Sequence, residues 1–324
     1  GTGTQLFDGG ADNDTIQLDL TNWEGSLDPD FDQIIEVNLL DGHSGQKDNT
    51  TLQDTLTDIE NIEFIGSYDT ELIGDDNDNI IIGDSGNDKI YGGEGHDLLK
   101  SGPGDDEIYG EGGDDTLVLN GSGTQLFDGG TGNDTIQLDM RNWTISLNPD
   151  YEQIIEVNLL DGISGQKGNS SLRDTLTDIE NIEFLGSYNT KLAGDNNDNI
   201  IIGGDGNDHI FGLGGSDVFT GGSGKDQFRL NALYNGSDLI DSFATITDFE
   251  EFDQLVFSEY GFSKSLEEVK NQFTVIQDKA NDKTYVSIDT GVATIDDMFT
   301  LEGVFYLKGY GIEEDKDNPN LYIS

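Results

Sequence analysis

The chain of 324 residues contains no cysteine, so disulfides, zinc–thiolate sites and thiol nucleophiles are excluded. It has only 15 Lys and Arg, too few for a basic surface that binds nucleic acid phosphates or an anionic membrane. No apolar run reaches the roughly 18 residues of a transmembrane helix. The chain opens without a Met or a signal peptide, and we interpret it as a piece of a longer protein.

Acidic residues and glycine are abundant instead. The chain holds 66 Asp and Glu, 44 Gly and only 4 Pro, with a formal charge of −51. Such a charge would favour disorder, yet Ile, Leu, Val and Phe recur at regular spacing. A bound cation that completes the fold would reconcile the two observations. Carboxylate and carbonyl oxygens are hard ligands, so they favour Ca²⁺ over thiophilic metals.

A long internal repeat organises the sequence. Residues 1–100 match residues 121–220 at 70 of 100 positions without a single insertion. The stretch 3–10, for example, recurs as 123–130. A repeat is the signature of a solenoid, in which neighbouring copies stack on one another. We therefore interpret the chain as a duplicated 120-residue unit within one continuous solenoid.

A nine-residue period, G-G-x-G-x-D-x-U-x with U apolar, runs inside each copy. The clearest turns are residues 83–91, 92–100, 101–109 and 110–118, then 203–211, 212–220 and 221–229. Residues 73–81 and 193–201 are interpreted as degenerate turns that carry Asp78 and Asp198 at the sixth position. Residues 119–127 place Thr124 there, and we expect single-residue slips at Ile82 and Asp128.

The period has a direct structural interpretation. Glycines at positions 1, 2 and 4 permit positive φ and a tight turn whose carbonyl oxygens point inward. The Asp at position 6 adds a carboxylate, and positions 7 to 9 form a short strand with U in the core. Two nonapeptides make one coil of 18 residues. Turns two repeats apart then stack at about the 4.8 Å strand spacing, and a cation between them receives oxygens from both.

This geometry predicts the metal ligands. We expect partners between Asp78 and Asp97, Asp88 and Asp106, Asp97 and Asp115, Asp198 and Asp217, and Asp208 and Asp226. The candidate carboxylates are Asp14, Asp78, Asp88, Asp97, Asp106, Asp115, Asp134, Asp198, Asp208, Asp217 and Asp226. The candidate carbonyl donors are Gly83, Gly86, Gly92, Gly95, Gly104, Gly203, Gly206, Gly212, Gly215 and Gly224. Five further acidic residues are either additional ligands or surface charge, and we favour surface charge: Asp12, Asp75, Asp76, Asp84 and Asp195.

Two other regions break the period. Residues 18–72 and 138–192 contain strand-like runs without tight turns, and are either longer rungs of the solenoid or a loop packed on its side. Beyond residue 229 glycine becomes rarer. Runs at 238–240, 244–249, 255–257, 285–288 and 304–307 predict strands, and 265–272 predicts a short helix. We expect three regions: 1–120, 121–229, and a β-rich cap over 230–324 that covers the last rung.

The turns GGEGHDLLK, GGDGNDHIF and GGSGKDQFR resemble the repeats of the RTX (repeats-in-toxin) family. The resemblance extends over essentially the whole chain. It implies an all-β, right-handed parallel β-roll, unfolded in low cytosolic calcium and exported by type I secretion machinery. It also implies a fold completed by several Ca²⁺ ions outside a Gram-negative-type bacterium, in the medium or on the cell surface.

Three functions remain open at this stage. The chain could be a structural or adhesive part of a large surface protein, or a non-catalytic folding and secretion module of a secreted hydrolase or polysaccharide-modifying enzyme. It could also bind polysaccharide, or another matrix component, through Trp23 and Trp143, which occupy matching positions in the two copies. The three histidines, His43, His96 and His209, lie far apart and no HExxH occurs. We therefore expect no catalytic site in this chain.

Overall fold

The computed structural model describes residues 4–22, 27–51, 53–141, 152–170, 173–230, 233–235, 238–240, 242–248, 254–257, 273–278, 283–288 and 297–302. Every helix or strand in these residues is a β-strand. The helix expected at 265–272, the strand at 304–307, Trp23 and Trp143 lie outside them. No described helix is long and apolar enough to cross a membrane. The chain divides into unit 1, Gly1–Asp139 with Ser170–Ile179, and unit 2, Met140–Asn169 with Glu180–Ser324.

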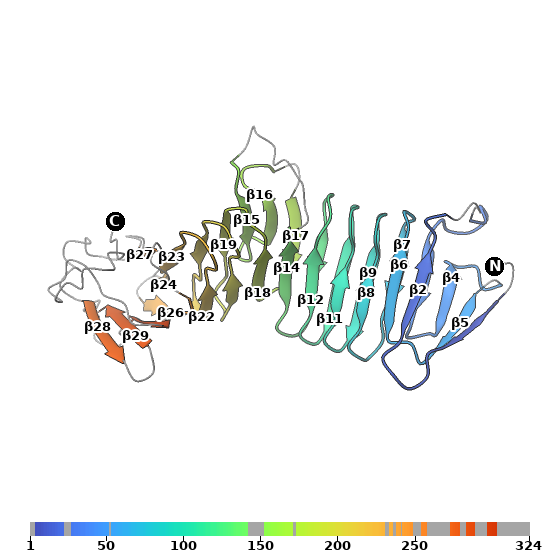
Figure 1. Cartoon of the computed structure of the whole chain (residues 1–324), viewed down its shortest axis with the longest axis horizontal. Helices are drawn as coiled ribbons and strands as arrows, with labels where there is room; N and C mark the ends of the chain where they lie inside the picture. The colour runs from blue at the N-terminus through green and yellow to red at the C-terminus, as the bar shows by residue number, and fades with distance from the viewer. Residues whose placement is uncertain are drawn as a thin grey trace. The chain divides into compact units, whose positions relative to one another are not determined.

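Unit 1 consists of short strands that alternate between two sheets (Figure 1). Its strands are β1 (Leu6–Asp8), β2 (Thr15–Asp19), β3 (Ile35–Asn38), β4 (His43–Gln46), β5 (Asp54–Thr57), β6 (Asn61–Ile65), β7 (Thr70–Ile73), β8 (Ile80–Ile82), β9 (Lys89–Glu94), β10 (Leu98–Lys100), β11 (Glu107–Gly112), β12 (Thr116–Leu119), β13 (Leu126–Asp128), β14 (Thr135–Asp139) and β17 (Arg173–Thr177).

The two sheets of unit 1 differ in how their strands pair. We call them A1, in the order β1-β5-β4-β3-β7-β9-β11-β13-β17, and B1, in the order β2-β6-β8-β10-β12-β14. All neighbours in B1 run parallel. From β7 onward, neighbours in A1 also run parallel, and the chain passes to the other sheet after each strand. This alternation confirms the expected parallel β-roll.

The apolar eighth residue of each nonapeptide forms the core. Ile90 is paired with Ile108 in A1, and Leu99 with Leu117 in B1, so each pair is separated by one coil of 18 residues. All four side chains are fully buried. One apolar side chain per nonapeptide is a thin core, because few apolar contacts oppose the conformational entropy lost when nine residues become ordered.

The non-repetitive segment of the first copy is part of the sheet rather than a loop on its side. β3 and β4 pair antiparallel, β4 pairs antiparallel with β5, and β3 continues in parallel with β7. The segment therefore adds a hairpin to A1, while β2 and β6 remain direct neighbours in B1. At the hairpin turn, the Asp41 N–H donates to Asn38 Oδ1 at 2.7 Å.

Unit 2 repeats this design. Its strands are β15 (Ile155–Asn158), β16 (Ile163–Gln166), β18 (Asn181–Leu185), β19 (Thr190–Ala193), β20 (Ile200–Ile202), β21 (His209–Phe211), β22 (Gly215–Thr220), β23 (Gln227–Leu230), β24 (Leu233–Asn235), β25 (Asp238–Ile240), β26 (Ser242–Ile246), β27 (Gln254–Phe257), β28 (Phe273–Asp278), β29 (Lys283–Ile288) and β30 (Asp297–Glu302). Sheet A2 has the order β16-β15-β19-β21-β23-β27, and sheet B2 the order β18-β20-β22-β26-β30-β29-β28.

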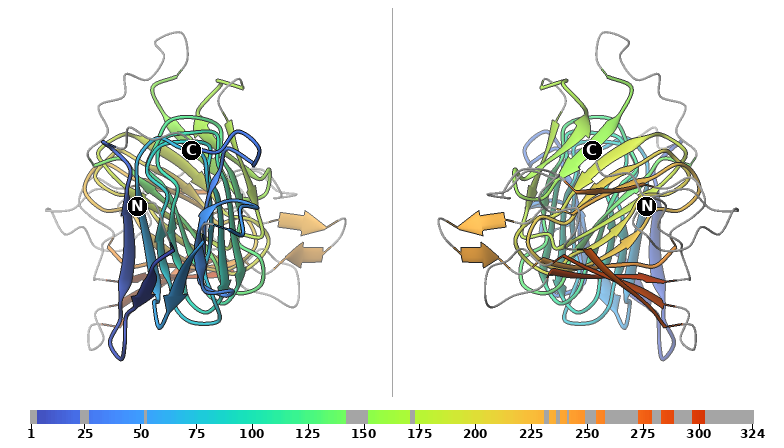
Figure 2. Two further views of the ribbon diagram at one scale, coloured as in Figure 1. Left: turned by 90° about the vertical axis from the view of Figure 1, so that its right-hand side faces the viewer. Right: turned by 90° about the vertical axis from the view of Figure 1, so that its left-hand side faces the viewer.

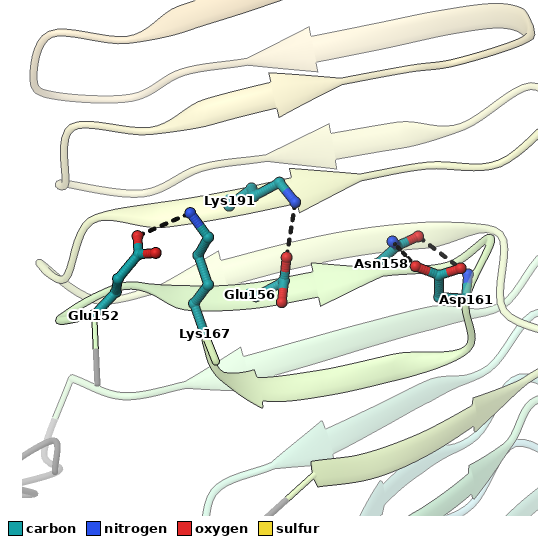
Figure 3. A network of polar contacts seen from close by, with 6 residues as sticks. All are labelled: Glu152, Glu156, Asn158, Asp161, Lys167 and Lys191. Carbon is teal, nitrogen blue, oxygen red and sulfur yellow. Dashed lines mark hydrogen bonds and ion pairs between the residues drawn. The ribbon is translucent and has the colours of Figure 1, made fainter. Parts of the chain in front are cut away.

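Charged side chains hold the β15–β16 hairpin of unit 2 in sheet A2 (Figure 3). Lys191 on β19 pairs with Glu156 on β15 at 2.7 Å, and Lys167 pairs with Glu152 at 2.8 Å. Asn158 and Asp161 close the turn, where the Asp161 N–H donates to Asn158 Oδ1 at 3.1 Å. Unit 1 uses a different ion pair, Lys47 with Glu71 on β7, because Glu71 stands where unit 2 has Lys191.

The segment after residue 229 contains the strands that the sequence predicts at 238–240, 244–249, 255–257 and 285–288. β26 runs parallel to β22 and β27 parallel to β23, so parallel pairing continues beyond the last clear nonapeptide. β30, β29 and β28 then pair antiparallel at the end of B2, and a cap over 230–324 stays a prediction. β24 and β25 form a separate hairpin that stands apart from the two large sheets (Figure 2).

Candidate metal centre

The turns of the roll stack in two rows, one before the strands of the A sheets and one before those of the B sheets. Asp88 and Asp106 precede β9 and β11, whereas Asp97 and Asp115 precede β10 and β12. In unit 2, Asp208 and Asp226 precede β21 and β23. Because each row has one turn per coil, residues 18 apart become neighbours along the roll.

The predicted pairing of sixth-position aspartates is confirmed in three cases. The N–H of Asp88 donates to Asp106 Oδ1 at 2.8 Å, and that of Asp97 to Asp115 Oδ1 at 2.8 Å. In unit 2 the N–H of Asp208 donates to Asp226 Oδ1 at 2.9 Å. All six residues are at most 3% exposed. The carboxylates are therefore inside the turn rows, in contact with the next turn.

Two predicted positions are wrong by one residue. Asn79, not Asp78, is buried opposite Asp97 and donates its N–H to Asp97 Oδ1 at 2.7 Å. Asn199, not Asp198, likewise donates to Asp217 Oδ1 at 3.1 Å. Asp78 and Asp198 occupy the exposed fifth position. The correct turns are 74–82 and 194–202, so there is no slip at Ile82.

The register of the turn before β13 also differs from the prediction. The Asp106 N–H donates to Gln125 Oε1 at 2.9 Å, so Gln125 rather than Thr124 holds the sixth position. Residues 120–128 form this nonapeptide, and the single extra residue of the run is Leu119 rather than Asp128. Leu119 follows the buried Val118 at the end of β12 and is itself buried, which explains how the sheet absorbs it.

The more isolated candidates, Asp14 and Asp134, also occupy sixth positions. Asp134 is fully buried, and its Oδ1 accepts from the Asp115 N–H at 2.8 Å. Asp14 precedes β2, and its carbonyl accepts from the Asn61 N–H at 3.0 Å. Both therefore belong to the B1 row, although the sequence period around them is irregular.

The second carboxylate oxygen points to a missing partner. In Asp14, Asp88, Asp97, Asp106, Asp115 and Asp208, Oδ2 is buried and accepts no hydrogen bond. A buried carboxylate oxygen without a donor carries an energetic penalty that a cation would remove. Burial, together with the charge of Asp106, raises the pKa of Asp88 to about 7. Burial also raises the pKa of Asp97 and Asp217 to about 7, and of Asp106, Asp134 and Asp208 to about 6.

First-position glycines leave room beside these oxygens. A Cβ on Gly92 would lie 2.3 Å from Asp97 Oδ2 and 2.8 Å from the Gly110 carbonyl oxygen of the next coil. A Cβ on Gly203 would likewise meet Asp208 Oδ2 at 2.6 Å and the Gly221 carbonyl oxygen at 2.7 Å. Neither glycine has positive φ. The prediction that position 1 needs glycine for its φ is therefore wrong, because what it needs is space.

In the clearest nonapeptides, position 2 adopts the left-handed backbone, and so do the fourth-position glycines other than Gly104 and Gly206. Gly93 and Gly95 have φ of 112° and 119°. At position 2, Glu111 and Leu213 adopt φ of 73° and 79° without being glycine, which costs strain. Fourth-position carbonyls point at the next turn of their row, because a Cβ on Gly104 would lie 1.6 Å from the Gly86 carbonyl oxygen. Gly224 meets the Gly206 carbonyl oxygen in the same way, at 1.7 Å.

The remaining predicted glycines follow this pattern. Gly83 and Gly212 are first-position glycines whose Cβ would strike Asp88 Oδ2 and Asp217 Oδ2, at 2.6 and 1.8 Å. Gly215 is a fourth-position glycine with φ of 90° that lies against the Asn197 carbonyl oxygen of the preceding turn.

This donor set fits Ca²⁺. In the part of the chain that the structure describes, no three Asp, Glu or His side chains gather at one point. Each turn instead offers carboxylate oxygens together with main-chain carbonyl oxygens. An all-oxygen, mixed carboxylate and carbonyl set is the one that Ca²⁺ prefers. The sixth-position aspartates, with carbonyl oxygens of the neighbouring turns, are the residues that would hold it.

Gly92→Ala is expected to weaken calcium binding at least several-fold, because the new methyl group occupies the space between Asp97 Oδ2 and the Gly110 carbonyl oxygen. Gly112→Ala is the matched control, since its Cβ would meet only the flexible end of the Glu94 side chain, at 3.1 Å. Calcium titration followed by circular dichroism measures both variants. Equal calcium affinities in the two variants would contradict this role for the first-position glycine.

The fifth position forms a second ladder that we did not predict. The His96 N–H donates to Asp78 Oδ1 at 2.8 Å, and the Asp105 N–H donates to Asn87 Oδ1 at 2.9 Å. Thr124 continues the ladder through Asp105 Oδ1 at 2.8 Å. The sequence could have indicated this ladder, because small polar residues with an acceptor atom recur at the fifth position of the nonapeptide.

The histidines serve structural contacts. His96 Nδ1 accepts the N–H of Asp114 at 2.9 Å in the fifth-position ladder. His43 lies 3.2 Å from Glu36 across the β3–β4 hairpin. His209 lies on β21, and burial lowers its pKa. The three belong to separate strands or turns.

Comparison with known protein families finds a match to the nonapeptide turns. The profile of the RTX calcium-binding nonapeptide repeat matches four segments, residues 64–99, 95–122, 119–139 and 193–228. No curated protein matches the chain. Among solved structures, the chain is similar to the extracellular lipase LipA from Serratia marcescens, at 18% identity and a TM-score of 0.24. The similarity covers 73% of this chain and 38% of the length of that lipase.

Proposed function

Because the chain is a member of the RTX calcium-binding repeat family through residues 64–139 and 193–228, we propose that it is a non-catalytic module that folds when Ca²⁺ binds. The observation that carries the proposal is the set of buried Asp Oδ2 atoms without a donor. At Asp14, Asp88, Asp97, Asp115 and Asp208, this oxygen lies beside a space that the first-position glycine leaves free. A cation in this space would neutralise the carboxylates and bridge successive turns.

The thin core explains why the metal would be needed. One apolar side chain per nonapeptide does not compensate for the ordering of the turn, and unscreened carboxylates in one row repel each other. The free energy of calcium binding then becomes folding free energy. Without calcium the same charges favour an expanded chain, which suits a protein exported in the unfolded state.

We further propose an extracellular location, since weak calcium sites fill only at the millimolar concentrations found outside cells. Export by type I secretion machinery follows from the family resemblance. A structural role, as a calcium-stiffened part of an adhesive surface protein, agrees with a duplicated array of turns. The alternative, an accessory module of a secreted hydrolase or polysaccharide-modifying enzyme, uses the same calcium-dependent fold. Binding of polysaccharide through Trp23 and Trp143 stays a prediction.

Calorimetric titration of the EDTA-treated chain with Ca²⁺ tests the proposal. We expect several ions to bind per chain, with heat release that accompanies the gain of β-structure. Mg²⁺ is the control, because it demands a smaller octahedral site and releases its water reluctantly, so it should fail to replace Ca²⁺. Absence of calcium binding at millimolar concentration would overturn the proposed function.

A further inference from the structure

In two turns of the roll, the sixth-position side chain is an Asn whose polar atoms all have hydrogen-bond partners within the protein. Asn79 is buried at the sixth position of its turn, where the neighbouring turns of the run carry Asp. Its Nδ2 donates to the Glu60 carbonyl oxygen of the preceding turn at 2.7 Å, and to Asp75 Oδ1 at 3.2 Å. Its Oδ1 accepts from the Asp75 N–H at 2.8 Å. Both polar atoms of the side chain are therefore satisfied by the protein itself.

The second copy contains the same arrangement. Asn199 Nδ2 donates to the Glu180 carbonyl oxygen at 2.7 Å and to Asp195 Oδ1 at 3.2 Å. Its Oδ1 accepts from the Asp195 N–H at 2.8 Å. Elsewhere in the rows, the sixth-position side chain is an aspartate whose buried Oδ2 accepts no hydrogen bond, as at Asp88 and Asp208. In these two turns the oxygen beside the first-position glycine is Asn Oδ1, which a Cβ on Gly74 or Gly194 would meet at 2.2 or 2.0 Å. This oxygen is uncharged and already accepts a backbone N–H.

The other edge of the same coil is neutral too. Thr70 holds the sixth position of its turn and is the first residue of β7. It donates both its N–H and its hydroxyl to Asp88 Oδ1, at 2.9 and 2.7 Å. Thr190 makes the same two hydrogen bonds to Asp208, each at 2.8 Å. In each copy, one coil with Thr and Asn at its two sixth positions therefore directly precedes the run of consecutive aspartate turns, which starts at Asp88 or Asp208, and already supplies donors to it.

We propose that the coils around Thr70 and Asn79, and around Thr190 and Asn199, bind no calcium, and that each run of calcium-binding turns begins on such a metal-free coil. The inference deepens the proposed function, because it defines where each calcium run starts. At these turns an uncharged oxygen with a backbone N–H donor stands where the other turns place a carboxylate oxygen without one, so the coil would keep its geometry at calcium concentrations that leave the aspartate turns unfilled.

Counting bound calcium by equilibrium dialysis of the full chain at saturating Ca²⁺ tests the proposal. Asn79→Ser removes the amide without adding charge, so the count should equal that of the unchanged chain. Asn79→Asp places a carboxylate against the Glu60 carbonyl oxygen and the Asp75 carboxylate, a new all-oxygen set, and should bind one additional ion. Asp76→Asn, a change of charge at an exposed position of the same turn, should leave the count unchanged.

Loss of one ion in Asn79→Ser, or no additional ion in Asn79→Asp, would overturn the proposal. If a variant in the first copy fails to fold, the matched Asn199→Ser and Asn199→Asp in the second copy give the same two readings. A chain that binds no calcium before any substitution would instead overturn the proposed function, so the two failures are distinguishable.

Discussion

Replacing Asp97 with Asn is expected to raise the calcium concentration at the folding midpoint by roughly two to three orders of magnitude. Asp97 is 3% exposed, its Oδ2 has no donor, and the Gly110 carbonyl oxygen lies on the far side of the same space. Removing one partner of a buried charge pair costs about 3–5 kcal/mol, and about 1.4 kcal/mol is tenfold in an equilibrium constant. Asn keeps an acceptor for the Asn79 N–H, so the loss of charge dominates the effect.

Asp76→Asn serves as the matched control for this substitution. It removes the same charge from an exposed position one coil away, where surrounding water screens it. Far-ultraviolet circular dichroism during a calcium titration gives both midpoints. If both substitutions shift the midpoint by the same amount, general charge reduction rather than a specific ligand explains the effect, and Asp97 is not a ligand.

The second large effect is expected from pH in the absence of calcium. Burial raises the pKa of Asp88, Asp97 and Asp217 to about 7 in the folded state, whereas an unfolded Asp titrates near 3.9. Between these values the folded chain binds more protons than the unfolded chain, so its stability rises as the pH falls. Protons then neutralise the carboxylates in place of calcium, and the stability of the metal-free roll should rise from about pH 7 down to about pH 4.

Thermal unfolding in EDTA at pH 8, 6.5 and 5 measures this dependence. We expect little β-structure at pH 8 and a cooperative transition at pH 5, while exposed carboxylates, which ordinarily titrate near 4, change little over this range. In the presence of calcium the order reverses, because protons compete with the ion for the same oxygens, and the calcium midpoint should rise at pH 5. Stability in EDTA that is constant or increases from pH 5 to 8 would contradict the assignment of buried carboxylates.

The nine-residue period predicted the repetitive part of the fold because side-chain burial follows it directly. Ile108 and Leu117 lie in the core, and Asp88 and Asp106 are neighbours, as their spacing of 18 residues requires. The register failed at Asn79, because an adjacent Asp78 has the charge expected of a ligand. Sequence alone could not reveal that an amide with suitably placed carbonyl acceptors fits the sixth position equally well.

The inserted hairpins could not be predicted for a different reason. Strands β3 and β4 lie in sheet A1 but break the nine-residue period, and their pairing depends on contacts with β5 and β7 that are distant in sequence. Strand-like runs were recognisable there, but their direction and partners were not. The same limit applies to Gln125, where a single additional residue, Leu119, shifts the register of the turn.

The most direct measurement of the central claim is a calcium titration of the EDTA-treated chain at pH 8, followed by far-ultraviolet circular dichroism. If oxygen ligands between stacked turns require Ca²⁺, most of the β-sheet signal should be absent in excess EDTA and should return cooperatively as calcium reaches the millimolar range. A full β-sheet signal in EDTA, unchanged on addition of calcium, would contradict the account.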